Sequence, residues 1–229
     1  MPFVLLFSMA YRCNMPLQKT MRQNSIQPQI SIKLPDPVYK SDISIEEALL
    51  KRRSVRGYKN EALELKEISQ LLWAAQGITS KSDGGRTVPS AGALYPLEIY
   101  LATGNINSLP PGVYHYQPFG HTLQLITEGD KIKSLSVAAH SQGSINRSMA
   151  VIVIAAEYSR TTRKYSERGI RYVQLEAGHA AQNICLQAIS LNLGTVTIGA
   201  FTDSMVKQTL NLPETEEPLY LMPVGKKRN

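Results

Sequence analysis

The chain has 229 residues, of which 43% are hydrophobic and 19% are charged. These values are typical of one globular domain and exclude a disordered chain, a collagen and a coiled coil. The 25 Lys and Arg residues outnumber the 18 Asp and Glu residues, and the net charge of +7 suits an anionic ligand or a nucleic acid. Two cysteines, Cys13 and Cys185, are too few for a disulfide scaffold and lie in no Cys/His cluster, which predicts a reducing, cytoplasmic location and no metal site.

The first 40 residues differ in character from the rest. No run reaches the roughly 20 apolar residues that a membrane span requires, so we expect no association with a membrane. The short apolar run Phe3–Ala10 has no basic flank before it, which argues against a signal peptide. From Tyr11 to Lys40 the chain is polar and interrupted by prolines, which predicts an extended arm over residues 1–40 and a single domain over residues 41–229.

The first half of the domain contains two helix patterns and three strand patterns. Ser44 and Glu47 have the spacing of a capping box and predict a helix over Ile45–Arg53. Apolar residues from Ile68 to Ala75 at helical spacing, followed by Gly77, predict a second helix. Apolar and alternating runs between turn residues predict strands over 98–103, 112–116 and 122–126, the last two as a hairpin.

The second half begins with the continuous β-branched run Ala150–Ala156, which predicts a strand buried on both faces. Residues 165–193 predict the longest helix, ended by Gly194, and the small residues from Ala177 to Ala181 favour a central or dimer-forming helix. A strand over 195–198, a helix over 203–210 and a strand over 219–224 complete the pattern. We predict an α+β fold with a mixed, mostly antiparallel central sheet enclosed by helices.

Two segments are suited to an anionic or flat ligand. Three guanidinium groups and a hydroxyl gather in Arg52, Arg53, Ser54 and Arg56, a set that suits the oxygens of a phosphate. The alternative is a solvated basic face, and no aromatic residues that would stack bases are interleaved with it. The small residues of Pro89–Pro96 would let backbone amides contact a flat ligand, with a plain loop as the alternative.

Two further segments follow. Gly194 and Gly199 bracket a short strand without the Gly-x-Gly-x-x-Gly spacing of a dinucleotide fold. The run Lys164–Tyr172, with Glu176, His179, Gln182 and Asn183 after it, is unusually polar for a buried helix and predicts either a dimer interface or a ligand site. No nucleophile motif or Walker-type phosphate loop is present in the sequence.

These segments together resemble the FMN-dependent nitroreductase superfamily. The resemblance rests on their order: Arg-Arg-Ser-x-Arg, Pro-Ser-Ala-Gly-Ala-Leu-Tyr-Pro before a strand, Gly-Thr-x-x-Ile-Gly-Ala-Phe after a long helix, and Pro-Val-Gly-Lys near the C-terminus. The continuation to Glu98 and the Lys164–Asn183 segment are similar to the SagB-type, azoline-oxidising dehydrogenase branch.

The resemblance implies a nitroreductase-like homodimer with FMN at the subunit interface and the long helix in that interface. It implies that the phosphate is held by Arg52, Arg53, Ser54, Arg56, Lys226 and Lys227. It implies that one segment lies along the flavin of the partner subunit: Pro89, Ser90, Ala91, Gly92, Ala93 and Leu94. Backbone groups of Ile198, Gly199 and Ala200 are expected to contact the flavin ring, where a glycine permits close approach.

The resemblance also implies a catalytic pair. Lys164 and Tyr165 match the Lys-Tyr pair of azoline-oxidising relatives, in which lysine accepts a proton from carbon as hydride leaves for the flavin. The alternative is that Lys164 is a surface residue. Many nitroreductases have Asn and Gln where this chain has Ala93 and Tyr95, so backbone groups must replace those side-chain hydrogen bonds.

We therefore expect an FMN-dependent oxidoreductase that performs azoline-to-azole oxidation, or a related flavin redox reaction, on a small organic or peptide substrate. The first alternative is a general reductase of nitro or quinone compounds with a nicotinamide as electron donor. Others are an FMN protein with a changed role, such as flavin cleavage, and a basic nucleic-acid-binding module without catalysis.

Overall fold

The computed structural model describes residues 30–228. The predicted apolar run Phe3–Ala10, Cys13 and the first 29 residues of the predicted arm lie outside the described residues. Within the described part of the arm, Ser31–Lys33 forms strand β1, which pairs antiparallel with β6 at the edge of the main sheet.

The main sheet has seven strands in the order β1-β6-β5-β3-β7-β9-β8, and all of its pairings are antiparallel. Besides β1, its strands are β3 (Leu97–Thr103), β5 (Gly112–Gln117), β6 (Thr122–Glu128), β7 (Ala150–Ala156), β8 (Leu193–Thr195) and β9 (Glu217–Lys226). A second sheet pairs β2 (Leu63–Glu64) and β4 (Ile106–Asn107) in parallel. The strands predicted over 98–103, 112–116, 122–126, 150–156 and 219–224 and the β5–β6 hairpin are confirmed, whereas the strand predicted over 195–198 is wrong in its bounds, because β8 ends at Thr195.

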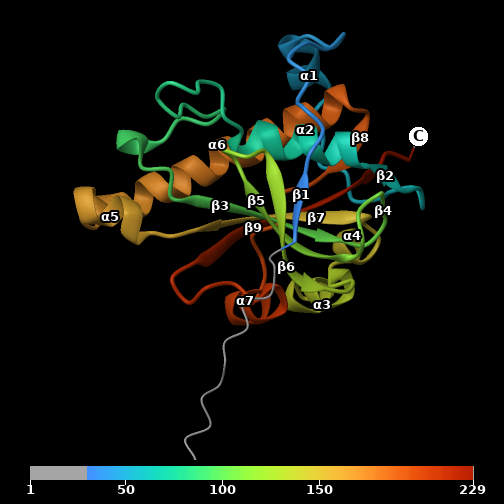
Figure 1. Cartoon of the computed structure of the whole chain (residues 1–229). Helices are drawn as coiled ribbons and strands as arrows, with labels where there is room; N and C mark the ends of the chain where they lie inside the picture. The colour runs from blue at the N-terminus through green and yellow to red at the C-terminus, as the bar shows by residue number, and fades with distance from the viewer. Residues whose placement is uncertain (1–29, 229) are drawn as a thin grey trace, which may run out of the picture.

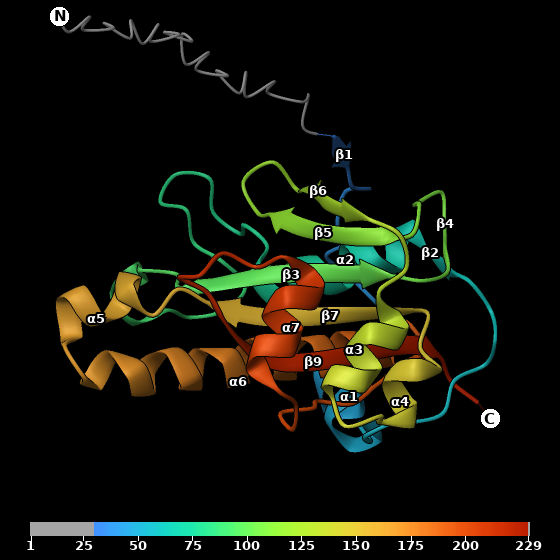
Figure 2. The same ribbon diagram turned by 90° about the horizontal axis from the view of Figure 1, so that it is seen from below.

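Helices cover both faces of the sheet (Figures 1 and 2). On one face lie α2 (Leu65–Gln76) and α6 (Arg168–Ser190), and on the other lie α3 (Ile132–Ala138) and α7 (Asp203–Leu210). The remaining helices are α1 (Ile45–Lys51), the 3₁₀ turn η1 (Ala91–Ala93), α4 (Gly143–Asn146) and α5 (Ser159–Tyr165). Each face has its own hydrophobic core, and all seven residues of β7 are buried between the two.

At the start of α1, one of the two hydrogen bonds of the predicted capping box is present. The Ser44 hydroxyl accepts a hydrogen bond from the Glu47 N–H at 3.1 Å. The Glu47 carboxylate instead forms an ion pair with Lys51, one helical turn further on. The helix ends at Lys51 rather than at Arg53, so the basic segment that follows it has no regular structure.

The predicted single helix over residues 165–193 is wrong in its bounds. The chain breaks between α5 and α6 at Ser166, whose φ of 51° is in the left-handed region. Gly169 permits the break, since a Cβ there would lie 2.9 Å from the Thr162 backbone. The helix ends at Ser190, and Gly194 lies inside β8 instead of ending the helix.

Across residues 30–228, no helix has both the length and the apolar character needed to span a bilayer.

Candidate functional site

The basic segment between α1 and Tyr58 is held against the edge of the main sheet. The Val55 N–H donates to the carbonyl of Thr195 in β8 at 2.9 Å. Gly194 makes this approach possible, because a Cβ there would lie 2.5 Å from Cγ1 of Val55. The exposed side chains of Ser54 and Arg56 have no hydrogen-bond or ion-pair partner among the described residues, so both are available to a ligand.

The predicted phosphate ligands differ in what else they bind. Arg53 donates through Nη1 to the carbonyls of Leu50 and Arg52, at 2.9 and 2.7 Å, and so helps to cap α1. Lys226 forms an ion pair with the buried Glu67 of α2. Lys227 lies nearby, where partial burial and the charge of Lys51 lower the pKa of its ammonium group. An anion bound beside Lys227 would raise the pKa of its ammonium group and so oppose the effects of burial and of Lys51.

Two further residues that the sequence patterns did not single out belong to this basic region. The charge of Lys51 lowers the pKa of Lys227. The guanidinium of Arg147 donates a hydrogen bond to the carbonyl of Arg56 at 3.4 Å. Arg147 follows the short helix α4, which hydrophobic periodicity did not predict. Neither residue carried a sequence signal, because their proximity to the segment arises from the tertiary fold.

The segment Ile198–Ala200 follows the short strand β8. Ile198 exchanges two backbone hydrogen bonds with Leu221 of β9, at 3.0 and 2.9 Å, and so fixes the segment to the sheet. Gly199 and Ala200 are exposed, and within residues 30–228 their N–H groups donate to no acceptor. The Ala200 carbonyl accepts a hydrogen bond from Gln142 at 3.1 Å. The arrangement leaves two backbone amide donors available to a ligand.

The segment Pro89–Leu94 forms a tight turn that contains η1. The Ser90 carbonyl accepts from the Ala93 N–H at 3.0 Å, and the Ser90 hydroxyl accepts from the Tyr95 N–H at 2.8 Å. Gly92, Ala93 and Tyr95 have φ values of 65°, 55° and 46°, so two residues with side chains occupy the left-handed region. Such a conformation persists only where surrounding contacts hold it.

Two groups of contacts hold the turn. On one side, Arg160 of α5 donates to the Tyr95 carbonyl at 3.2 Å and pairs with Glu98 of β3 at 2.5 Å. Burial opposes ionisation of Glu98, but hydrogen bonds from His115 and Arg160 hold the pKa of its carboxyl below the usual range. On the other side, the guanidinium of Arg86 lies 4.4 Å from the centre of the Tyr95 ring.

The predicted catalytic pair lies directly against this turn. Lys164 and Tyr165 end α5, and a Cβ at Gly92 would lie 2.8 Å from the Tyr165 Oη and 3.0 Å from the Lys164 Nζ. Lys164 is exposed and its Nζ lies 5.5 Å from the centre of the Tyr165 ring. The fold therefore brings together the turn and the pair, which are about 70 residues apart in the sequence.

The basic segment and the turn lie near opposite ends of α6. The turn contacts Tyr165 just before the helix begins, whereas Arg52 lies close enough to Cys185, near the helix end, to lower the thiol's pKa, although burial raises it more. Arg168 and Cys185 are separated by roughly 25 Å along the helix axis at 1.5 Å per residue. Within one chain, the two candidate segments are thus separated from each other.

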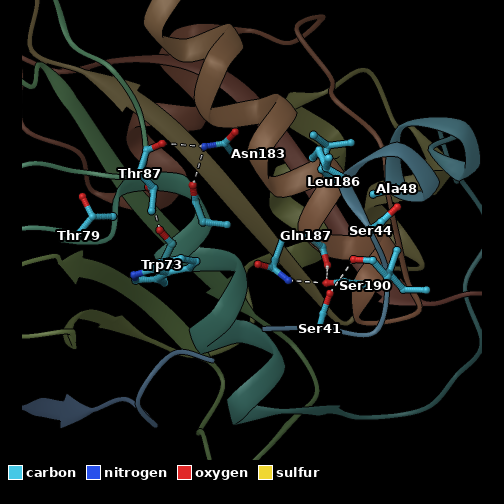
Figure 3. Close-up of a pocket in the computed structure, with 13 residues that line it drawn as sticks. Ser41, Ser44, Ala48, Trp73, Thr79, Thr87, Asn183, Leu186, Gln187 and Ser190 are labelled. Atoms are coloured by element: carbon cyan, nitrogen blue, oxygen red, sulfur yellow. Dashed lines mark hydrogen bonds between the residues drawn. The ribbon is translucent and has the colours of Figure 1, made fainter. Parts of the chain in front are cut away.

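Two adjoining cavities open on the same face of the molecule, and neither is lined by a predicted phosphate, flavin or catalytic residue, although Asn183 of the predicted polar helix lines one of them. One, of about 500 Å³, lies between α1, α2 and α6 (Figure 3). There Asn183 of α6 donates to the carbonyls of Ala74 and Thr87, at 3.2 and 3.1 Å. The other, of about 670 Å³, lies beside residues 36–43 of the arm. Large apolar side chains that line them stay exposed, among them Tyr39 at 75% and Ile45 at 56%.

Comparisons with known proteins place these features in a family context. The nitroreductase family profile matches residues 49–226. Protein MJ1384 of Methanocaldococcus jannaschii, which is named as a nitroreductase, is 46% identical over 198 residues, 86% of this chain and 97% of that protein. The microcin B17-processing protein McbC of Escherichia coli is 29% identical over 169 residues, 71% of this chain and 62% of McbC.

One solved structure with the same fold contains a peptide. In the E. coli microcin synthetase complex McbBCD with truncated pro-MccB17 bound, one chain superposes with a TM-score of 0.67 at 25% identity. The match covers 96% of this chain and 85% of that chain. This superposition confirms the predicted fold class.

The contact between the turn and the catalytic pair predicts a specific response to Gly92→Ala. The new Cβ would force Tyr165 and Lys164 away from the turn, in addition to straining a residue with positive φ. We expect the free energy of unfolding to fall by about 1–3 kcal/mol, the usual cost of overpacking.

The matched control is Gly84→Ala. Gly84 also has a positive φ, of 72°, but its added Cβ meets only the Phe119 ring, at 3.5 Å. Denaturant unfolding of both variants separates the backbone strain from the contact with the pair. An equal loss of stability in the two variants would contradict the contact.

Proposed function

Since the chain belongs to the nitroreductase family, we propose that it is an FMN-dependent oxidoreductase that converts azolines to azoles in a peptide or small organic substrate. The observation that carries the proposal is the contact of Lys164 and Tyr165 with the Gly92 turn. The similarity to McbC, which processes microcin B17, and to a chain of the pro-MccB17 complex supports a peptide substrate.

The basic segment fits the phosphate of FMN. Arg56 and Ser54 offer a guanidinium and a hydroxyl without internal partners, and Arg52 and Lys227 add charge beside them. Charge-assisted hydrogen bonds to a phosphate are about twice as strong as neutral ones. Arg53 and Lys226 have internal partners, so in this proposal they shape the site and contribute charge from a second layer.

The remaining groups fit a flavin ring. The free N–H groups of Gly199 and Ala200 would donate to polar atoms at the ring edge, where they would stabilise negative charge. From a second subunit, the small residues Ala91, Gly92 and Ala93 would let the turn lie flat along the ring, flanked by Pro89 and Leu94. FMN supplies the acceptor for the hydride that the substrate loses.

Lys164 would accept the proton that the substrate loses, and Tyr165 would orient the substrate. An azoline becomes an azole by losing two hydrogens, one as a proton and one as a hydride. The unprotonated Nζ of Lys164 takes the proton from the ring carbon, and the electron pair of that C–H bond forms the new ring double bond. The Tyr165 hydroxyl, beside Gly92, would orient the substrate and donate to its heteroatom.

A homodimer would unite the two half-sites. The basic segment and the turn are too far apart along α6 to serve one small group within a single chain. The outer face of α6 carries the exposed Leu175 next to Gly178, around which a Cβ would find open space. Together with the exposed apolar residues of α1, this face has the character of an interface between two copies.

A general nitro or quinone reductase with a nicotinamide donor is the second candidate. The name of the M. jannaschii relative favours it, and that relative is more similar to this chain than McbC is. Because a phosphate site would account for the basic segment, the nucleic-acid-binding alternative has no remaining support.

The first test of the proposal concerns Lys164. Lys164→Ala should retain FMN but slow the anaerobic bleaching of the flavin by a thiazoline or oxazoline peptide about a hundredfold, the usual contribution of a positioned base. Tyr165→Phe should have a smaller effect, because water can replace part of its role. Stopped-flow absorbance measures both rates.

The matched control is Arg163→Ala, which removes the exposed basic residue next to Lys164 and should leave the rate unchanged. Equal rates for Lys164→Ala and the parent would show that the lysine is a surface residue. A parent protein that bleaches with a reduced nicotinamide but with no azoline is a general reductase.

The second test concerns the phosphate. Arg56→Ala should weaken FMN binding by one to two orders of magnitude, because a charge-assisted hydrogen bond contributes about 1.5–3 kcal/mol. Lys133→Ala removes a positive charge from an exposed position of α3 and should not change the dissociation constant. Titration of flavin fluorescence measures both, and equal constants would remove Arg56 from the site.

The third test concerns the dimer. Leu175→Asp should shift the protein from dimer to monomer in sedimentation velocity and release FMN in parallel, because burying a carboxylate in an interface is costly. Val137→Asp introduces the same charge at an exposed apolar position of α3 and should remain dimeric. An FMN-saturated monomer of the parent at micromolar concentration would contradict the shared site.

A further inference from the structure

Arg160 lies at the start of α5, the helix that ends in the predicted catalytic pair, and it takes no part in the proposed reaction. Each of its three guanidinium nitrogens contacts a different segment of the chain. Nε donates to Oε2 of Glu157 at 2.9 Å, and Nη2 pairs with Oε1 of Glu98 in β3 at 2.5 Å. Nη1 donates to the carbonyl of Tyr95 at 3.2 Å. Because a guanidinium is planar and its donors point in fixed directions, the three contacts together fix its orientation.

Glu98 is itself held from two sides. One carboxylate oxygen binds Arg160, and the other accepts a hydrogen bond from Nε2 of His115 at 2.6 Å. The amide of Gln117 donates to Nδ1 of the same ring at 3.0 Å, so the proton of the neutral ring lies on Nε2. The ring also stacks on Tyr100, with 4.5 Å between the ring centres. Arg160 is therefore anchored to a rigid part of the main sheet.

Glu157 ties the beginning of α5 to the end of the turn. Its Oε1 accepts a hydrogen bond from the Ser159 hydroxyl at 2.7 Å, and its N–H donates to the carbonyl of Pro96 at 2.9 Å. Its second carboxylate oxygen binds Arg160. The first residues of α5 are thus joined to the turn through both backbone and side chain.

Tyr95 is the residue of the turn that most requires support. Its φ of 46° lies in the left-handed region, which is unfavourable for a bulky side chain. It also precedes Pro96, and proline restricts the conformation of the residue before it. A strained residue of this kind persists only where its surroundings hold it. Here Arg160 binds its carbonyl, and Arg86 lies over its ring.

Helix α5 therefore contacts the turn at two points. Arg160, near its start, binds Tyr95, and Lys164 and Tyr165, at its end, lie against Gly92. Arg160 and Lys164 are four residues apart, which corresponds to about 6 Å along a helix axis. A single contact would let the turn pivot about it, whereas two contacts fix both its distance from the helix and its orientation.

We propose that Arg160 is a positioning residue: it clamps the turn to α5, so that Gly92 stays against Lys164 and Tyr165. Glu98 acts in the same clamp, because it fixes the guanidinium group. The inference rests on the proposed function for what the turn and the catalytic pair do, whereas the contacts of Arg160 are properties of this chain.

Amide hydrogen exchange of the FMN-loaded protein tests the clamp. Arg160→Lys keeps the positive charge, but one ammonium group cannot bind three segments in fixed directions. Protection of the Ala93 and Tyr95 amides should fall about tenfold, because hydrogen bonds from a charged group are lost, while the amides of β7 should keep the protection of the parent. The matched control is Arg163→Lys, the same substitution at an exposed position of α5, which should behave like the parent.

Two results of this experiment would overturn the inference. The first is equal protection of the two turn amides in Arg160→Lys and in the parent. The second is an equal loss of protection in β7, because the substitution would then destabilise the whole fold rather than the turn.

Glu98→Gln provides an independent variant, since it retains the shape of the side chain and removes its charge. It should lower the protection of the same two amides, but less than Arg160→Lys does. The double variant should lose no more protection than Arg160→Lys alone, because both substitutions act on one clamp. Losses that add up in the double variant would contradict the common clamp.

The kinetics of flavin bleaching distinguish positioning from substrate binding. With a saturating azoline peptide, the bleaching rate of Arg160→Lys should fall about ten- to a hundredfold, because the catalytic pair is misplaced. The peptide concentration that gives half of the maximal rate should stay unchanged, because Arg160 does not contact the substrate. An unchanged maximal rate would overturn the positioning role. A local loss of protection in a protein that no azoline bleaches would support the clamp and contradict the proposed function.

Discussion

The burial of β7 on both faces is the constraint from which the rest of the fold follows. A strand of seven apolar residues in the interior of an antiparallel sheet must be covered above and below, so helices are required on each side. The longest of them, α6, crosses one face of the sheet and extends from the Gly92 turn to the basic segment. The positions of the two candidate segments therefore depend on how α6 covers a core strand.

Residue patterns predicted those parts of the fold that depend on local periodicity. Strand β7, helix α2 and the β5–β6 hairpin have apolar spacings that only one secondary structure satisfies. The break at Ser166 was missed because nothing in its neighbourhood interrupts the helical pattern except Gly169, whose purpose is close contact with Thr162. Helices α3 and α4 were missed because they are short and their apolar faces become apparent only against the second core.

In the candidate site, too, local residue patterns predicted some features and missed those that depend on tertiary contacts. Its segments were recognisable because their residue types suit a phosphate and a flat ring, and the fold places Lys164 and Tyr165 against the turn as one group. The ion pair of Lys226 with Glu67 and the hydrogen bond from Arg147 to Arg56 join residues that are 159 and 91 positions apart in the sequence. Local spacing patterns cannot predict contacts over such separations. Glu176 was recognisable in the sequence as part of a polar helix, but its burial, to 3% exposure, depends on the tertiary packing of α6.

The attachment of Val55 to Thr195 has a consequence for the behaviour of the protein in concentrated solution. Strand β8 ends the sheet, and an uncovered strand edge invites pairing with the edge of another molecule. The basic segment covers this edge with its own backbone and surrounds it with like charges that repel a second copy. The residues that are available to an anion therefore also protect the strand edge from pairing with another molecule. A change that detaches the segment from β8 would expose the unpaired edge of β8 and would also separate the basic residues from one another.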